Sequence, residues 1–264
     1  MPGKNNSHVK YLRRLAGRRF RDQEGKFLVE GVRFVEEALN STWSVEMLVY
    51  SPRITEDGRG GRLLTSAANR GITLLEVKDP LFNELSGTET PQGILALVRQ
   101  RNNTLEELTA AGEPALLVLV DGVRDPGNLG GIIRTADAAG AGGVILLKGT
   151  ADMYNPKTLR STMGSLFHLP VIQGCAAEVV MTHLEERGIK TVAGEPRAAR
   201  AVYECDLRVP CALAVGGEAA GAGEALLGRV SDLVRIPMPG RAESLNVAIS
   251  AAILLYEAVR QRQT

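Results

Sequence analysis

The chain has 264 residues, of which 44% are hydrophobic, 23% charged and only 4% aromatic, and its net charge is +1. This length exceeds the roughly 100 to 200 residues of one typical core, so we expect two modest domains. No apolar run reaches the roughly 20 residues of a membrane span, the basic N-terminus lacks the apolar stretch of a secretion signal, and the three cysteines form no C-x-x-C pair. We therefore expect a cytoplasmic protein with no membrane partner, no bound metal and cysteines that serve packing.

Positive charge is concentrated near the N-terminus. Residues 1–33 carry nine Lys/Arg against three acidic residues, a local charge of +6, while the rest of the chain is −5. The stretch "KYLRRLAGRRFR" can pair with nucleic-acid phosphates, because each neutralised phosphate releases a condensed counterion. A solvated basic helix face explains the stretch equally well, so both interpretations stay open at this point.

The first hundred residues alternate between strand-like and helix-like runs. Short apolar runs predict strands at 26–31, 45–50, 72–77 and 93–100. Helical patterns between them predict helices at 32–39, 61–71 and 79–86. We predict a small α/β domain over residues 1–100 and a polar linker with a short helix over residues 101–114.

A second α/β series begins at Ala115 and defines a predicted domain over residues 115–264. Short apolar runs bounded by glycine or proline are typical of a parallel sheet covered on both faces, and they predict strands at 115–122, 143–149, 190–194, 211–217 and 232–238. A last helix is predicted from Leu245 to about Gln261. Apolar residues surround its first three turns, so we expect it to be buried between its own sheet and another body, most naturally a partner subunit.

The common catalytic signatures are absent from the sequence. No G-x-G-x-x-G follows a strand, and neither a P-loop, a G-x-S-x-G elbow nor a pair of carboxylates is present. The three histidines are isolated from one another and from the cysteines. These absences disfavour a nicotinamide-dependent oxidoreductase, a P-loop enzyme, a hydrolase and a metalloenzyme.

Polar residues instead gather in glycine-bearing loops at the ends of three predicted strands. In "DGVRDPGNLGGIIRTADAAG" (121–140), Asn128 lies near a helix start, where a capping role and a ligand role both remain open. Arg134 lies inside the same helix among apolar residues, an unfavourable position unless its donors meet an anion or a fixed acceptor.

The other two clusters follow the fourth and fifth strands of the second series. In "LAVGGEAAGAG", Glu218 follows two glycines whose missing side chains let a ligand approach the backbone. In "IPMPGRAESLNV", Ser244 is the predicted N-cap of the last helix and Asn246 lies in its first turn. A plain helix cap needs only one such polar residue.

In this order and spacing, the three clusters closely resemble the signatures of the SpoU, or TrmH-type, RNA 2'-O-ribose methyltransferases of the SPOUT superfamily. The motifs stand here as "NLGGIIRTADAAG", "VGGEAAG" with Ala219 where many members carry Gly, and "IPMPGRAESLNVAISAAILLYE". The stretch "STMGSLFHLPV" also matches the region between the first two motifs. The resemblance covers roughly residues 115–262, and the N-terminal region is more loosely similar to the ribosomal-protein-like substrate domain of rRNA-modifying members.

The resemblance implies an α/β fold of SPOUT type, a parallel sheet whose C-terminal segment is threaded as a deep trefoil knot. It also implies an active homodimer with S-adenosylmethionine (SAM) held in the knot, largely by backbone groups. By position, the cofactor-lining residues are Gly194, Gly216, Gly217, Ile236, Met238 and Leu245. The polar residues from Pro239 to Asn246 then face the methyl donor and the RNA, while the apolar helix behind them packs the dimer.

The same resemblance implies catalytic roles for Asn128, Arg134, Glu218, Ser244 and Asn246. Because the sulfonium of SAM already carries an activated methyl, the site has to align the ribose 2'-hydroxyl and stabilise charge developing on its oxygen. A guanidinium stays protonated, so we interpret Arg134 as a phosphate clamp and oxyanion donor rather than a base. The other four residues orient Arg134, the ribose and the SAM carboxyl or amino group.

An RNA substrate changes the interpretation of the basic N-terminal segment. We expect phosphate contacts from Arg13, Arg14, Arg18, Arg19 and Arg33. An rRNA substrate is favoured over tRNA, because tRNA-modifying relatives more often carry short helical extensions than a separate α/β domain. A tRNA 2'-O-methyltransferase and a non-catalytic RNA-binding factor with this fold remain the alternatives.

Overall fold

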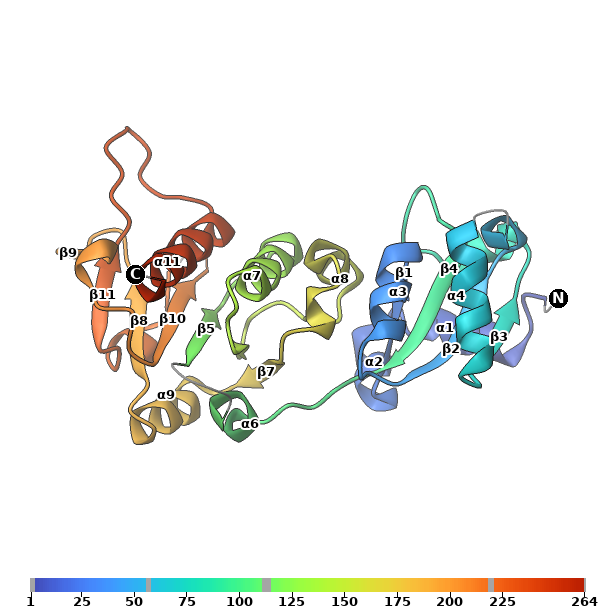
Figure 1. Cartoon of the computed structure of the whole chain (residues 1–264), viewed down its shortest axis with the longest axis horizontal. Coiled ribbons are helices and arrows are strands. Elements are labelled where there is room, and N and C mark those ends of the chain that lie inside the picture. The colour runs from blue at the N-terminus through green and yellow to red at the C-terminus, as the bar shows by residue number, and fades with distance from the viewer. Residues whose placement is uncertain (1–2, 56–57, 111–114, 218–220, 264) are drawn as a thin grey trace. The chain divides into compact units, whose positions relative to one another are not determined.

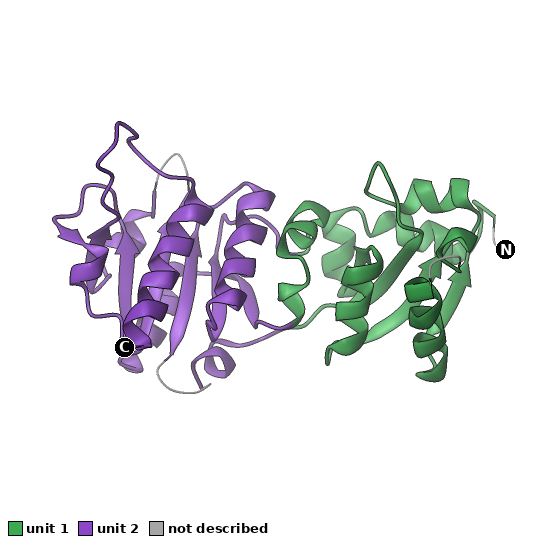
Figure 2. Ribbon diagram, turned by 45° about the horizontal axis from the view of Figure 1, so that its top comes forward, with its two compact units in different colours: residues 1–101, 154–167 green, residues 102–153, 168–264 purple. Residues whose placement is uncertain are grey.

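The computed structural model describes residues 3–55, 58–110, 115–217 and 221–263. The chain divides into two compact units, which Figure 2 shows in green and purple. Unit 1 comprises residues 1–101 and 154–167, and unit 2 comprises residues 102–153 and 168–264.

Unit 1 is a four-stranded sheet with helices packed against it (Figure 1). Its strands are β1 (Lys26–Glu30), β2 (Val45–Tyr50), β3 (Thr73–Glu76) and β4 (Ile94–Arg99). Its helices are α1 (Ser7–Arg14), α2 (Arg18–Glu24), α3 (Val32–Asn40), α4 (Gly58–Asn69), α5 (Asp79–Leu85) and α8 (Pro156–Thr162), with 3-10 turns η1 (Pro52–Thr55) and η2 (Ser165–Phe167). The strand order is β1-β4-β2-β3, in which β4 is antiparallel to both neighbours and β3 is parallel to β2.

The segment 154–167 packs within unit 1 although it lies between two strands of the other unit in sequence. The ring of Tyr154 lies 4.6 Å from that of Phe27 on β1, and the ring of Phe167 lies 5.4 Å from that of Phe34 on α3. Such aromatic pairs stabilise the contact beyond the area that they bury. Hydrophobic periodicity cannot predict that segment 154–167 packs in unit 1, because it indicates which side chains are buried but not which part of the chain they pack against.

Unit 2 is built on a seven-stranded parallel sheet. Its strands are β5 (Leu116–Asp121), β6 (Gly143–Leu147), β7 (Val171–Cys175), β8 (Lys190–Gly194), β9 (Arg200–Ala201), β10 (Cys211–Gly216) and β11 (Asp232–Arg235). Its helices are α6 (Leu105–Ala110), α7 (Pro126–Ala138), α9 (Ala177–Glu186), α10 (Glu224–Leu227) and α11 (Val247–Arg262), with the 3-10 turn η3 (Val202–Glu204). The strand order is β7-β6-β5-β10-β8-β11-β9, and every neighbouring pair is parallel.

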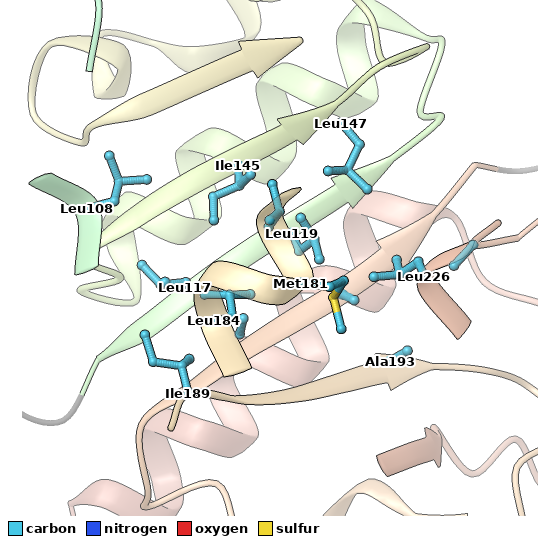
Figure 3. Close-up of a cluster of buried hydrophobic side chains, with 14 of the residues drawn as sticks. Leu108, Leu117, Leu119, Ile145, Leu147, Met181, Leu184, Ile189, Ala193 and Leu226 are labelled. Atoms are coloured by element: carbon cyan, nitrogen blue, oxygen red, sulfur yellow. The ribbon is translucent and has the colours of Figure 1, made fainter. Parts of the chain in front are cut away.

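Helices cover both faces of this sheet. On one face, Met181 and Leu184 of α9 pack with Leu117 and Leu119 of β5 in a fully buried cluster (Figure 3). Side chains alternate along a strand, so the intervening β5 residues point to the opposite face. There α11 packs against both α7 and β10. This double cover explains why the strands are almost uniformly apolar.

The predicted α/β fold with a parallel second sheet is confirmed. The last helix begins later than predicted, at Val247 rather than Leu245. It is also covered on one side only within the chain, because Ile249 and Tyr256 are 53% and 51% exposed. β7 is not predicted from the sequence, because its five residues include only a short apolar run, are unevenly buried and contain a glycine near the end. None of the helices in the described ranges is long and apolar enough to cross a membrane.

Candidate functional site

The carboxyl ends of four adjacent strands form one edge of the unit 2 sheet. Because β5, β10, β8 and β11 are parallel neighbours, their last residues lie along this edge: Asp121, Gly216, Gly194 and Arg235. The chain leaves β5 toward β6 but reaches β10 and β8 on its other side, and open α/β sheets bind ligands beside such a reversal. The predicted cofactor residues Gly194, Gly216, Gly217 and Ile236 all lie at or directly after these strand ends.

Asn246 joins two of the predicted motifs. Its side-chain Nδ2 donates to Asn128 Oδ1 on α7 at 2.9 Å, across 118 positions of sequence. Its Oδ1 accepts the backbone N–H groups of Ala248 at 2.9 Å and Ile249 at 3.4 Å, so Asn246 is the N-cap of α11. The prediction that Ser244 caps this helix is therefore wrong. The same Asn246 amide therefore caps α11 and contacts Asn128.

Asn128 does not cap its own helix. Asp125 is the N-cap of α7, and its carboxylate accepts the Asn128 backbone N–H at 2.8 Å. The Asn128 side chain is thereby left to accept from Asn246. Of the two roles left open by the sequence, capping is wrong.

Arg134 is exposed on α7. Its guanidinium makes no hydrogen bond or ion pair with any residue of the described chain, although the flanking Ile132 and Ile133 are fully buried. The structure does not join Arg134 to Asn128 or Asn246. Five donors are therefore available to an external anion.

The remaining predicted site residues lie between β11 and α11 or beyond β10. Ile236 and Met238 are half-buried, Leu245 is 36% exposed, and Ser244 is exposed. In the described chain Ser244 has no hydrogen-bond partner. The predicted catalytic Glu218 lies outside the described residues.

Gly216, the last residue of β10, and Gly217, which follows it, lie so close to other backbone atoms that neither position has room for a side chain. A Cβ on Gly216 would lie 1.9 Å from the Ala222 nitrogen, and one on Gly217 would lie 2.4 Å from the Gly122 oxygen. Both distances are shorter than any real contact, so only glycine fits at either position. The space predicted to admit a ligand at these two glycines is filled by backbone: at Gly216 by Gly221 and Ala222 of the same loop, and at Gly217 by Gly122. The second contact places the loop after β10 against the loop after β5.

Two residues that the sequence did not single out hold these loops together. Asp121, the last residue of β5, accepts the Gly223 backbone N–H through Oδ2 at 2.7 Å. Thr150 Oγ1 donates to the Val120 carbonyl and accepts the Gly122 N–H, both at 3.1 Å. A polar residue directly at the end of a buried strand is the sequence signal that points to Asp121.

The thiols of the protein are poor nucleophiles. Burial raises the pKa of the Cys175, Cys205 and Cys211 thiols, so they stay protonated at neutral pH. No group of three or more His, Cys, Asp or Glu side chains within the described ranges is arranged to hold a metal ion.

The predicted RNA-contacting arginines in unit 1 differ in whether their guanidinium groups already contact other side chains of the protein. Arg13 is ion-paired with Glu84, and Arg18 is 3.6 Å from Asp22. Arg14 lies over the Phe20 ring, 3.9 Å from its centroid. The exposed Arg19 and Arg33 make no side-chain hydrogen bond or ion pair with the residues that the structure describes. The basic segment is therefore less available to phosphate than its formal charge suggests.

Comparisons with known proteins agree with this geometry. Residues 115–256 match the sequence model of the SpoU rRNA Methylase family, and residues 6–96 match the MRM3-like substrate binding domain. A 23S rRNA (guanosine(2553)-2'-O)-methyltransferase of Bacillus subtilis (strain 168) is 38% identical over 95% of this chain and 95% of its own length. A 23S rRNA (uridine(2479)-2'-O)-methyltransferase of Streptomyces viridochromogenes is 36% identical over 94% of this chain and 87% of its own length.

The fold is also similar to solved structures of such enzymes. Two of these are crystal structures of the SpoU methyltransferase AviRb from Streptomyces viridochromogenes. The first superposes on this chain with a TM-score of 0.88, and the second, a complex with the cofactor AdoMet, with a TM-score of 0.89. The complex shows 35% sequence identity, and the similarity covers 98% of this chain and 99% of that chain. The family match spans more than half of the chain and the curated relatives align with nearly all of it, so this protein belongs to the SpoU rRNA methylase family.

Proposed function

We propose that this protein transfers a methyl group from SAM to a ribose 2'-hydroxyl of large-subunit rRNA. The observation that carries the proposal is the hydrogen bond between Asn246 and Asn128, which joins the third motif to the first at the ligand-binding edge of the sheet. The names of the two relatives place their substrates in 23S rRNA. Those names specify different nucleotides, so the substrate class carries over and the nucleotide does not.

The residues at the sheet edge fit SAM. Ile236, Met238 and Leu245 follow β11 in the segment that leads to α11, and their apolar side chains are partly exposed, so they can cover an adenine ring and a thioether. Gly194, Gly216 and Gly217 leave only backbone groups at these strand ends. When bound, SAM supplies an activated methyl on a sulfonium, so no nucleophilic side chain is needed.

The side chains of this protein then have to position the RNA. Arg134 holds a phosphate beside the reacting ribose and stabilises the charge developing on the 2'-oxygen. Asn128, fixed by Asn246, orients the ribose. Glu218 and Ser244 complete the predicted set. Because a guanidinium has donors but no acceptor, the 2'-hydroxyl proton leaves to water or to an RNA phosphate.

Replacing Arg134 with alanine tests this assignment. We expect Arg134→Ala to lower the rate of methyl transfer by a factor of about 100 or more, since one preorganised donor contributes about 10²–10³ in rate. The dissociation constant for SAM should change by less than about twofold, because Arg134 contacts RNA rather than cofactor. Single-turnover transfer and calorimetric SAM titration measure the two effects.

The matched control is Arg208→Ala, which removes an exposed arginine whose partner Asp206 lies two positions away. This variant should retain wild-type turnover. An Arg134→Ala enzyme that keeps half its rate would exclude Arg134 from catalysis.

The substrate class is tested with radiolabelled SAM and unmodified large-subunit rRNA, small-subunit rRNA and bulk tRNA. Label in large-subunit rRNA alone is expected, and mapping of the 2'-O-methylated position would identify the nucleotide. Label in tRNA alone would replace rRNA with the tRNA alternative. SAM binding without transfer to any naked or ribosome-assembled RNA would favour the non-catalytic alternative.

We further propose that the C-terminal segment forms a trefoil knot, with residues 239–246 in the knot loop and at the start of the last helix. β11 lies beyond β8 in the sheet, yet α11 packs on α7 and β10, so segment 236–246 crosses back over the carboxyl edge. The active unit is a homodimer packed through the exposed apolar face of α11. The face contains Ile249 and Tyr256.

We assign RNA binding to the N-terminal domain over residues 1–100, connected by the linker 101–114 to a methyltransferase domain over residues 115–264, of which segment 154–167 packs within unit 1. Arg14, Arg19 and Arg33 are exposed and available to phosphate, whereas Arg13 and Arg18 contact RNA only by exchanging Glu84 and Asp22 for phosphate. An rRNA substrate favours a cytoplasmic location.

A further inference from the structure

Unit 1 contains a cavity of about 340 Å³ that the methyl-transfer chemistry does not use. It is enclosed by α1, α2, β1, α3, α5 and α8, all within this unit. We propose that the cavity binds one unpaired nucleotide of the RNA substrate, with the base inside and the phosphate at the rim. This inference rests on the proposed RNA substrate and assigns unit 1 a base-reading role in addition to phosphate contacts.

The size and the walls of the cavity suit a nucleobase. Its volume lies at the lower end of the roughly 300–1,000 Å³ typical of small-ligand sites, enough for one nucleoside-sized group. Leucine side chains and the ring of Phe34 line it, so the faces of a base would be buried against apolar groups. Proteins that read RNA by sequence insert such splayed-out bases into apolar pockets with a few fixed polar groups.

Glu30 provides the fixed polar group on the cavity wall. Its carboxylate accepts the hydroxyls of Ser86 and Thr88 on Oε1 and the Gly87 N–H on Oε2 at 3.0 Å. An ionised carboxylate has about four acceptor positions, so these three bonds orient it and leave one for a base N–H. A fixed, half-buried acceptor of this kind distinguishes bases by the donors on their edges.

Arg160 provides the charge at the rim. It is exposed on α8, and within the described chain its guanidinium makes a single long hydrogen bond, 3.5 Å to the Gly87 carbonyl. Most of its donors are therefore available to a phosphate. The cavity also borders α1 and α2, whose exposed Lys10, Arg14 and Arg19 extend the positive surface. This charge favours RNA over an apolar ligand.

A cavity-filling substitution tests the proposal directly. A Cβ on Gly87 would lie 3.4 Å from Arg160 Nη1 and 4.0 Å from Glu30 Oε2, both ordinary contacts, so Gly87→Leu places its side chain between the two recognition groups without backbone strain. Gly61→Leu on α4 is the matched control, because its Cβ would meet nothing within 4 Å. Fluorescence anisotropy of the full chain with a labelled single-stranded rRNA fragment measures affinity.

We expect Gly87→Leu to raise the dissociation constant for the fragment by about tenfold, within the range for losing one bound base. Gly61→Leu should bind like the wild type, and both variants should bind SAM normally. In a second pair that cannot disturb the core, Arg160→Gln should weaken RNA binding and lower the slope of log affinity against log salt by about one, consistent with one lost phosphate contact. Lys157→Gln, an exposed cation on the same helix that does not line the cavity, should have less effect than Arg160→Gln.

The outcomes separate this inference from the proposed function. Wild-type RNA affinity in a folded Gly87→Leu variant would overturn the cavity assignment, while methyl transfer by the same enzyme would leave the proposed function intact. If the wild type methylates no RNA but Gly87→Leu still weakens RNA binding, the proposed function fails and the cavity assignment holds. If Gly87→Leu abolishes binding of free nucleoside monophosphates and leaves RNA affinity unchanged, the occupant is a small nucleotide and the RNA assignment is wrong.

Discussion

Asn246 shows how one amide can serve helix capping and site assembly together. Its oxygen accepts the first free N–H groups of α11, and its nitrogen donates to Asn128 on α7. The cap falls on Asn246 rather than Ser244 because Asn246 directly precedes Val247, the first residue of α11. The crowding of polar residues before an apolar helix thus reflects a site and not a redundant cap.

Asp121 also positions part of the site through a single side chain. Its carboxylate accepts the Gly223 N–H and thereby holds the loop after β10. We expect Asp121→Ala to raise the dissociation constant for SAM about tenfold, since a hydrogen bond to a charged group contributes about 1.5–3 kcal/mol. The rate at saturating SAM should change by less than about threefold. Asp121→Asn keeps an acceptor oxygen and should restore most of the affinity.

Calorimetric SAM titration together with kcat measures this separation of binding from turnover. Asp206→Ala, which removes an exposed carboxylate paired with Arg208, should leave SAM affinity unchanged. Equal losses in kcat and affinity for Asp121→Ala, without recovery in Asp121→Asn, would indicate general misfolding instead of loop positioning.

At the scale of elements, the sequence predicts strands and helices well where burial is regular. Runs such as 116–121 and 211–216 are apolar and bounded by glycine or a polar residue, and they form β5 and β10. The start of α11 is harder to predict, because Ser244 and Asn246 are both good caps and the choice depends on Asn128, 118 positions away. A hydrogen bond between two residues so far apart leaves no periodic pattern in the sequence around either of them.

Asp232 joins three strands of the unit 2 sheet and predicts a pH dependence. Burial opposes its ionisation, but hydrogen bonds and charge from Lys190 on β8 and Arg200 on β9 lower the pKa of Asp232 below its usual 3.8. A carboxylate with a lowered folded-state pKa stabilises the protein above its unfolded pKa, and this contribution is lost as the pH falls through the folded pKa. Stability should therefore be steady near neutrality and decline below about pH 4.

Asp232→Asn should lower the free energy of unfolding at pH 7 by about 1–3 kcal/mol and flatten the acid decline. Urea unfolding between pH 3 and pH 8 measures both effects. Asp206→Asn is the matched control, because Asp206 is an exposed carboxylate whose ion-pair partner Arg208 lies two positions away on the surface, so it should change the free energy of unfolding less than Asp232→Asn. An unchanged acid decline in Asp232→Asn would contradict the assignment.

The last turn of α11 is fixed by a second set of contacts. Arg262 donates to the carbonyls of Leu207 and Val209, each at 2.9 Å, and to that of Ala115 at 3.2 Å. Arg262→Ala should lower the free energy of unfolding by about 1–3 kcal/mol, because three carbonyls lose a charged donor. Arg260→Ala, which breaks an exposed pair with Glu257, should cost less than about 1 kcal/mol. Equal effects in urea unfolding would refute this ranking.

At the scale of the whole molecule, charge counts overestimate the RNA-binding surface. The +6 of residues 1–33 includes Arg13, which Glu84 neutralises, and Arg21, which donates to the carbonyls of Leu15 and Ala16 inside the fold. The segment 154–167 likewise packs on unit 1 from the middle of the other series. Both features depend on contacts between distant parts of the chain, so no local pattern in the sequence reveals them.

The exposed face of α11 gives the strongest expectation about assembly. Ile249, Ile253 and Tyr256 recur at helical spacing, and Ile249 and Tyr256 remain 53% and 51% exposed while the opposite side of the helix is buried. A contiguous apolar stripe beside the proposed SAM site is costly in water unless a second copy covers it. We expect light scattering to give twice the chain mass for the wild type and the single-chain mass for Ile249→Lys. Val179→Lys, at a 60% exposed position on α9, should remain dimeric. A monomeric wild type, or an Ile249→Lys variant that stays dimeric, would move the interface away from this helix.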